Sequence, residues 1–333
     1  MRQSIRCISV AIVLATISFE SYSEILEIDL PANHISYSSL TGMLYATIPS
    51  SAGSPYGNGL VEISPADASV VDHVYVGSEP NPLAISPDSP IAYVGLDGSD
   101  AVRLVDLSSL TAGIQFGLGN DPSFGPYHAQ EIAVMPGTPA SIAVSLIQFG
   151  GDGNVAIFDS GVMRGSINPN VPYANAIAFG PSATSLFGYD NYSSSFGLTA
   201  YTIDPSGISS FMYASQVITG FGVTFVVDNS ILYATSGAVV DGASLQLMGT
   251  YNLHGPVVVD HSTHSVMFVR QTAVQVFDRD TFVPLFSLPI AAATGSPISA
   301  TGCGSSCLAV VFDSGQIFVI PHVSDTVFSN GFD

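Results

Sequence analysis

Polar side chains that could bind a cation recur along this 333-residue chain, several of them just before a short apolar run. Carboxamide and carboxylate oxygens are ligands that a hard cation such as Ca²⁺ prefers. The sequence therefore predicts a ligand-binding site, with Ca²⁺ as a candidate cofactor, wherever the fold brings these residues together. Asn also favours turns before strands, where it hydrogen-bonds its own backbone, and that interpretation stays open. The candidate residues are Asn33, His34, Asn81, His128, Gln130, Glu131, Asn175 and His254.

A second chemical feature is the pair Cys303 and Cys307, separated by Gly-Ser-Ser. In an exported protein such a close pair is typical of a disulfide, here across a tight turn between two strands. A redox-active pair would be expected at the Cys-x-x-Cys spacing, which is absent. A zinc site would need two further ligands, and only His322 is near in sequence. We expect a structural disulfide.

The elements that must position these residues follow from a weak repeat. Its clearest copy spans residues 80–106 and alternates short runs rich in Val, Ile, Leu, Ala and Tyr with turns of Gly, Asp, Ser and Pro. The unit recurs about seven times at roughly 37–48 residues, the spacing of β-propeller blades. No segment shows a sustained 3.6-residue period. The predicted fold is all-β, a seven-bladed β-propeller, in which the candidate site residues surround the mouth of the central channel.

The repeat units and the ring closure can be placed on the sequence. The seventh unit is one strand short, and residues 24–30 alternate apolar and polar side chains, so this N-terminal segment is predicted to complete the last blade as its outer strand. The predicted units are 33–77, 78–119, 120–167, 168–216, 217–253, 254–290 and 291–321.

Several of the predicted third strands end in Asp, followed by a polar turn. An Asp at this position suits an Asx-turn, in which the carboxylate accepts backbone N–H groups of the next turn. We therefore expect structural rather than catalytic roles for Asp106, Asp159, Asp204 and Asp278. Asp-rich loops at residues 95–100, 150–154 and 188–191 likewise favour hairpin turns over cation sites.

The ends of the chain indicate export. Arg2 and Arg6 precede a mostly apolar stretch, residues 7–19, and small residues at Ser21 and Ser23 suit cleavage before Glu24. We predict a signal peptide at residues 1–23, one propeller domain at 24–321 and a tail at 322–333. The protein would be secreted or periplasmic, and the mature chain would have no membrane span, since the apolar stretch is short of the about 20 residues that span a bilayer.

The charge is strongly negative. The full chain has 26 acidic residues, six Arg and no Lys, with a net charge of −20. Removal of Arg2, Arg6 and Glu20 leaves four arginines and 25 acidic residues, a net charge of −21. Nucleic acid is excluded as a partner because binding requires basic residues to neutralise phosphates. A quinone cofactor is not expected either, since propeller dehydrogenases commonly stack it on Trp and the chain has none.

Two resemblances support the fold. Residues 92–95, Ala-Tyr-Val-Gly, with 100–106 resemble the YVTN-type repeat of secreted seven-bladed propellers, although Gly95 and Leu96 replace the Thr-Asn of that motif. About half of the chain is similar to a group of uncharacterised secreted bacterial propeller proteins, which implies the fold and no activity. The final residues resemble the Phe-x-x-Gly-Phe-Glu tail of many secreted bacterial proteins, with Asp333 in place of Glu. The segments of the longer match are 131–139, 142–145, 155–161, 176–182, 186–191, 195–197, 218–222 and 231–237.

These features predict an exported binding or interaction module without an established catalytic activity. Its partner would be a protein, a glycan or a small molecule that binds where loops from all blades converge. An exposed patch on the 188–197 segment, with Tyr189, Tyr192 and Phe196, is one candidate surface. The alternative is a divalent-metal-dependent, lactonase-like hydrolase. Propeller lactonases hold a cation in the channel with Asn, Asp and Glu, and the metal candidates here are Asn81, Glu131 and Asn175.

Overall fold

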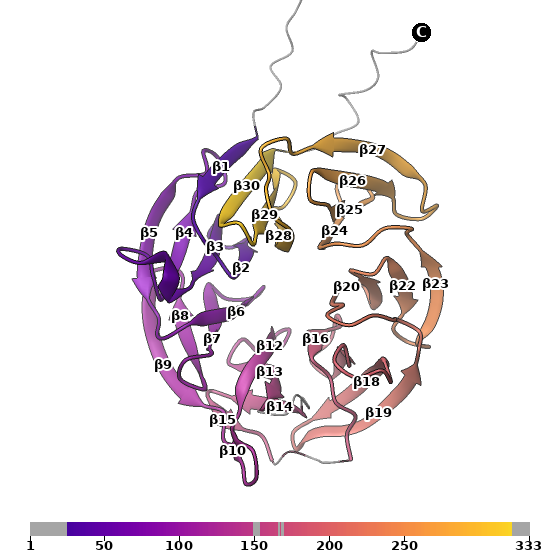
Figure 1. Cartoon of the computed structure of the whole chain (residues 1–333). Helices are drawn as coiled ribbons and strands as arrows, with labels where there is room; N and C mark the ends of the chain where they lie inside the picture. The colour runs from indigo at the N-terminus through magenta and orange to yellow at the C-terminus, as the bar shows by residue number, and fades with distance from the viewer. Residues whose placement is uncertain (1–24, 149–153, 166, 168–169, 322–333) are drawn as a thin grey trace, which may run out of the picture.

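The regular secondary structure of the described residues is almost entirely β-strand. The computed structural model describes residues 25–148, 154–165, 167 and 170–321, which form thirty strands and one short 3-10 helix, η1 (Ser50–Ala52). Seven four-stranded antiparallel sheets stand around a central space (Figure 1). The predicted seven-bladed propeller is thus confirmed. None of the helical structure in the described segments is long and apolar enough to cross a membrane. The predicted signal peptide and tail lie outside the described residues.

In blades one to six, four consecutive strands form a meander whose first strand lies innermost (Figure 1). Blade one has η1 in the connection between its second and third strands, and a two-stranded hairpin precedes blade three. Blade one consists of β2 (His34–Ser38), β3 (Met43–Ile48), β4 (Gly59–Ile63) and β5 (Val70–Tyr75). Blade two consists of β6 (Pro80–Ile85), β7 (Ile91–Leu96), β8 (Ala101–Asp106) and β9 (Thr111–Gly117). The hairpin is β10 (Asn120–Asp121) with β11 (Gly125–Pro126), and blade three consists of β12 (His128–Val134), β13 (Ser141–Ile147), β14 (Asn154–Asp159) and β15 (Val162–Met163).

Blades four to six repeat the same order, each within one of the predicted units. Blade four consists of β16 (Ala176–Phe179), β17 (Ser185–Tyr189), β18 (Gly197–Asp204) and β19 (Gly207–Ser215). Blade five consists of β20 (Phe225–Asp228), β21 (Ile231–Ala234), β22 (Ala238–Asp241) and β23 (Gln246–Thr250). Blade six consists of β24 (Val257–Asp260), β25 (Ser265–Val269), β26 (Ala273–Asp278) and β27 (Pro284–Pro289).

Blade seven joins the two ends of the chain, as predicted. It consists of β28 (Pro297–Gly302), β29 (Cys307–Phe312) and β30 (Gln316–Pro321), with β1 (Leu26–Asp29) as the outer strand. In Figure 1 the indigo strand β1 lies beside the yellow strand β30. Leu26 pairs with Val319 and Asp29 with Gln316 in antiparallel register. This pairing closes the ring because it covers the edge that β30 would otherwise expose.

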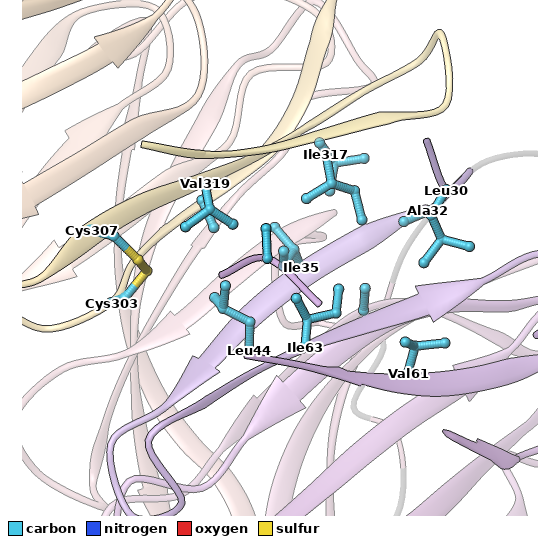
Figure 2. Close-up of a cluster of buried hydrophobic side chains, with 14 of the residues drawn as sticks. Leu30, Ala32, Ile35, Leu44, Val61, Ile63, Cys303, Cys307, Ile317 and Val319 are labelled. Atoms are coloured by element: carbon cyan, nitrogen blue, oxygen red, sulfur yellow. A yellow bond between two sulfur atoms is a disulfide. The ribbon is translucent and has the colours of Figure 1, made fainter. Parts of the chain in front are cut away.

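The seam between blades seven and one is packed as tightly as a domain core. Ile317 and Val319 of blade seven, and Ile35 and Leu44 of blade one, are fully buried in one cluster, and Leu30 in the connection between them is 5% exposed (Figure 2). The predicted disulfide between Cys303 and Cys307 is present, with a Cα–Cα distance of 4.9 Å, and it closes the turn from β28 to β29 at the edge of this cluster.

Close packing between blades requires a glycine at position 95. Gly95 lies on β7, and a Cβ atom at that position would stand 2.5 Å from Pro82 Cγ and 3.2 Å from Ala129 Cβ in the neighbouring blade. A larger residue would clash there, so the glycine permits the close approach of blades two and three.

Candidate functional site

A cavity of about 920 Å³ lies in the centre of the ring, walled by residues of six blades. We call it the channel cavity. It lies toward the end of the ring where the inner strands begin, which we call the channel mouth. Cavities of this size accommodate small-molecule ligands. Its wall mixes hydroxyl-bearing and apolar side chains, from residues 34–36, 131, 176–177, 219, 222–226, 235–236, 254–257 and 297–301.

Three of the eight predicted site residues line this cavity: His34 on β2, Glu131 on β12 and His254 just before β24. They are the only titratable side chains among the lining residues. A bulge on β12 helps to present Glu131, because the pairing with β13 shifts between Ala129 and Glu131 and leaves Gln130 unpaired and exposed. These three side chains, each a site candidate from the sequence, are the titratable groups that the described residues contribute to the cavity wall.

The Glu131 carboxyl is half-buried on the cavity wall and enclosed by protein on its other sides. Burial raises its pKa to about 7, because the charged form loses hydration, and the backbone N–H of Ile132 offsets only part of this. The strands packed against β12 are β6, β7, β8, β13 and β16. Their titratable and charged side chains are Tyr93, Arg103 and Asp106, and none contributes to the pKa of Glu131. Among the described residues no Arg or His forms an ion pair with this carboxyl.

The pKa of the His34 imidazole is lowered, whereas that of Glu131 is raised. Burial lowers its pKa to about 4, because the protonated form would lack hydration there. Its Nδ1 atom has no hydrogen-bond partner among the described residues, and neither does the hydroxyl of Ser236, which also lines the cavity. At neutral pH the wall therefore carries a neutral His34, and the hydroxyl of Ser236 is a second polar group there without a partner among the described residues.

The remaining predicted site residues do not line the cavity. Asn33 Nδ2 donates to the Pro80 carbonyl (2.8 Å), and Asn81 Nδ2 donates to Asp97 Oδ2 (2.8 Å). Both side chains thus make structural bonds at the channel mouth, and the bond from Asn33 joins blades one and two. His128 Nδ1 lies 3.8 Å from Asp100 Oδ1, away from the cavity wall.

Asn175 is a different case. It is 4% exposed, and its Nδ2 atom has no partner among the described residues. Of the three metal candidates, only Glu131 lines the channel cavity. Within the described residues no group of three or more His, Cys, Asp or Glu side chains is placed to hold a metal ion.

The channel mouth also carries exposed aromatic rings. Tyr192 is 63% exposed, but Tyr189 is buried and Phe196 is half-buried against Phe221, with ring centroids 5.1 Å apart. Phe221 is 68% exposed and was not singled out from the sequence. Its signal in the sequence was local: an aromatic residue flanked by Gly220 and Gly222, which are typical of a turn or connection.

Hydrogen bonds attach this aromatic segment to the cavity wall. The Gly222 N–H donates to the Asn191 carbonyl (3.1 Å), and Asn191 Nδ2 donates to the Val223 carbonyl (3.0 Å). Gly222 and Val223 both line the channel cavity. The exposed rings of Tyr192 and Phe221 therefore belong to segments held together at the rim of the cavity.

The turn carboxylates lie at the opposite end of the ring. Asp106 Oδ1 accepts the Ser108 N–H (2.8 Å), Asp204 Oδ1 accepts the Ser206 N–H (2.7 Å) and Asp278 Oδ1 accepts the Thr281 N–H (2.8 Å), as predicted for Asx-turns. The prediction was wrong for Asp159, whose carboxylate instead binds the guanidinium of Arg164 at 2.6 and 2.8 Å. An arginine five residues on offers a charged partner that outcompetes turn N–H groups.

Comparison with known proteins adds the fold and no more. No protein-family model matches the chain, and neither does any curated protein. Among solved structures it is similar to the β-propeller domain of Cps50 (Swd1) from Myceliophteria thermophila, with a TM-score of 0.68, 13% identity and coverage of 90% of this chain and 100% of that one. It is also similar to hydrazine synthase of Kuenenia stuttgartiensis, with a TM-score of 0.67, 15% identity and coverage of 93% and 100%.

Proposed function

We propose that this protein is an exported binding module whose ligand site is the channel cavity together with its rim. The observation that carries the proposal is the cavity of about 920 Å³, whose wall combines apolar side chains with Glu131, His34 and the unsatisfied hydroxyl of Ser236. Buried polar atoms are normally hydrogen-bonded. A wall that leaves His34 Nδ1 and Ser236 Oγ without partners among the described residues is suited to a ligand or to ordered water.

The rim supports the same proposal. Tyr192 and Phe221 expose large rings beside the cavity on segments that are tied to its wall. Aromatic residues with one apolar body and a free face are enriched at recognition surfaces. Loops from several blades converge at this end, as expected for a site carried by a rigid scaffold.

Export is supported by the basic and apolar N-terminal residues and by the disulfide Cys303–Cys307, which suits an oxidising compartment. Expression of the full chain in a Gram-negative host tests this part. Mass spectrometry of the periplasmic fraction should find a chain that begins at Glu24. A cytoplasmic chain of full length would contradict export.

The cavity can be tested with a matched pair of substitutions. Ile298 lines the cavity and is 47% exposed, and Ile114 on the outer strand β9 is 53% exposed. A library of small molecules is first screened against the wild-type protein by thermal shift. Ile298→Trp fills part of the cavity and should abolish the shifts, whereas Ile114→Trp should preserve them. Hits that survive Ile298→Trp would place the binding site elsewhere.

A further inference from the structure

The charge arrangement of the channel cavity restricts the class of ligand. Glu131 is the only carboxylate in its wall, and no Arg lines it. On the strands packed against β12 the one basic residue is Arg103, whose guanidinium donates to the Val76 and Gly113 carbonyls and to Gln115. Within the described residues no ion pair to the Glu131 carboxylate is present, and the only basic groups that share its cavity wall are the imidazoles of His34 and His254. A ligand with a permanent positive charge would therefore supply the counter-ion that the wall lacks.

The surroundings of the cavity favour positive ligands. Three acidic side chains lie close together at the channel mouth. The Asp97 carboxylate interacts electrostatically with the carboxylates of Glu79 and Asp100. The whole chain carries a net charge of −20. Such a field raises the local concentration of cations and repels anions before they reach the cavity. Anionic ligands are therefore disfavoured by charge both at the mouth and in the wall.

The rest of the wall distinguishes an organic cation from a metal ion. Ca²⁺ takes six to eight oxygen ligands, several of them carboxylates or carbonyls. Here the wall supplies a single carboxylate, together with hydroxyl groups and apolar side chains such as Ile177, Val223 and Ile298. Apolar walls match the alkyl groups of an organic cation, and a carboxylate matches its charge.

The geometry points to a small organic cation, a substituted or quaternary ammonium, as the ligand of the channel cavity, with Glu131 as its counter-ion. This inference rests on the proposed function, since it names the ligand class of the same site. The Ser236 hydroxyl, which lines the cavity and has no hydrogen-bond partner among the described residues, would accept or donate a hydrogen bond to a polar substituent of the ligand.

Choline and its uncharged isostere 3,3-dimethyl-1-butanol test the charge requirement directly, because they differ in charge and hardly in shape. Binding is measured by saturation-transfer NMR titration at about pH 8, above the pKa of Glu131 of about 7. The wild-type protein should bind choline at least tenfold more tightly than the isostere. In Glu131→Gln the two affinities should become equal. Equal affinities in the wild-type protein, or no binding of choline, would overturn the inference.

A second variant guards against misfolding of Glu131→Gln. Thr219 is exposed on the cavity wall, so Thr219→Lys places a competing ammonium there without disturbing the core. It should weaken choline binding at least tenfold and leave the isostere unchanged, and the matched control Thr219→Gln should leave both unchanged. Equal choline affinity in Thr219→Lys and Thr219→Gln would also count against the inference.

The experiments distinguish a failure of the proposed ligand class from a failure of the proposed function. If choline fails but an uncharged compound binds and Ile298→Trp abolishes that binding, the channel is a ligand site and only the ligand class is wrong. If no compound, charged or uncharged, depends on Ile298, both the proposed function and the ligand class are overturned.

Discussion

Carboxylates at the two ends of the ring behave in opposite ways. At the end with the turns, Asp106 accepts hydrogen bonds from Ser108 and Ser109, and these bonds lower its pKa. In the channel, Glu131 has no such side-chain donors, and burial raises its pKa to about 7. The same chemical group is therefore stabilised in its charged form by turn hydrogen bonds in one region and destabilised in its charged form by burial in the other.

This difference separates the carboxylates that stabilise each repeat from those that are candidates for function. Turn carboxylates of the Asp106 type recur in blade after blade because each serves its own turn, as Asp204, Asp241 and Asp278 do. Glu131 occurs in one blade and serves no local structure. A titratable side chain whose perturbed pKa lowers the stability of the fold, and which supports no turn, is a candidate for ligand binding.

The largest expected loss of stability comes from opening the ring. Deletion of residues 24–30 removes β1 and the buried Leu30, and we expect a loss of about 5 kcal/mol or more from the lost pairing and burial. For about 300 residues this corresponds to a decrease in Tm of about 8 °C. Differential scanning calorimetry checks it, and an unchanged Tm would refute closure by β1.

Glu131→Gln should raise the stability of the folded protein at alkaline pH. The unfolded chain releases this proton near pH 4.5 and the folded chain near 7, so wild-type stability falls as pH rises between these values. The glutamine variant avoids the loss. At about pH 8 it should be more stable by about 2 kcal/mol, after allowance for channel water, or about 3 °C in Tm. At about pH 4 the two should melt together, and parallel curves across this range would contradict the shift.

His34→Gln should show the opposite pH dependence. The folded protein keeps His34 neutral down to about 4, whereas the unfolded chain protonates it near 6.5, so wild-type stability falls as pH decreases through this window. The variant should gain about 2 kcal/mol over the wild-type protein at about pH 4.5 and nothing at about pH 8. Melting curves at both pH values decide, and a gain at pH 8 alone would point to a different cause.

Substitution of a turn carboxylate should lower the stability slightly and should not change ligand binding in the channel. Asp106→Ala loses the bonds to the turn N–H groups, and we expect Tm to fall by about 1–2 °C. Asp106→Asn keeps an acceptor oxygen and should match the wild-type protein. Ligand binding should be the same in all three. A loss of binding in Asp106→Ala would show that the two ends of the ring are coupled.

The smallest expected effect is that of metal ions. Because no cluster of three metal-binding acidic, His or Cys side chains exists within the described residues, Ca²⁺ and EDTA should leave Tm unchanged. An ion present at 100 times its Kd would add about 2.7 kcal/mol, or about 4 °C. A shift of that size, lost in an Asn81→Ala/Asn175→Ala double variant, would favour the lactonase-like hydrolase instead.

Much of the architecture could be predicted because it is encoded locally. Alternating apolar residues, turn signals and the blade-length repeat placed all seven blades, and the short seventh unit revealed the role of β1. The disulfide followed from five consecutive residues, 303–307. Asp106, Asp204 and Asp278 were also predictable, since an Asx-turn involves only the next few residues.

The site could be predicted only in part. His34, Glu131 and His254 were named because of their position before or at the start of inner strands. The same reasoning included Asn33 and Asn81, whose partners Pro80 and Asp97 lie at other points of the chain. Gln130 and Glu131 are adjacent, and only the bulge on β12 decided which of them faces the channel.

The sequence by itself determined the blades, the ring closure, the turn carboxylates and the strongly acidic charge, because each depends on neighbouring residues or on composition. Only the tertiary structure decided which polar groups face the channel and which are satisfied elsewhere. The pKa of Glu131 and the exposure of Phe221 depend on burial by several blades at once. Burial is a property of the assembled ring, and no single repeat contains it.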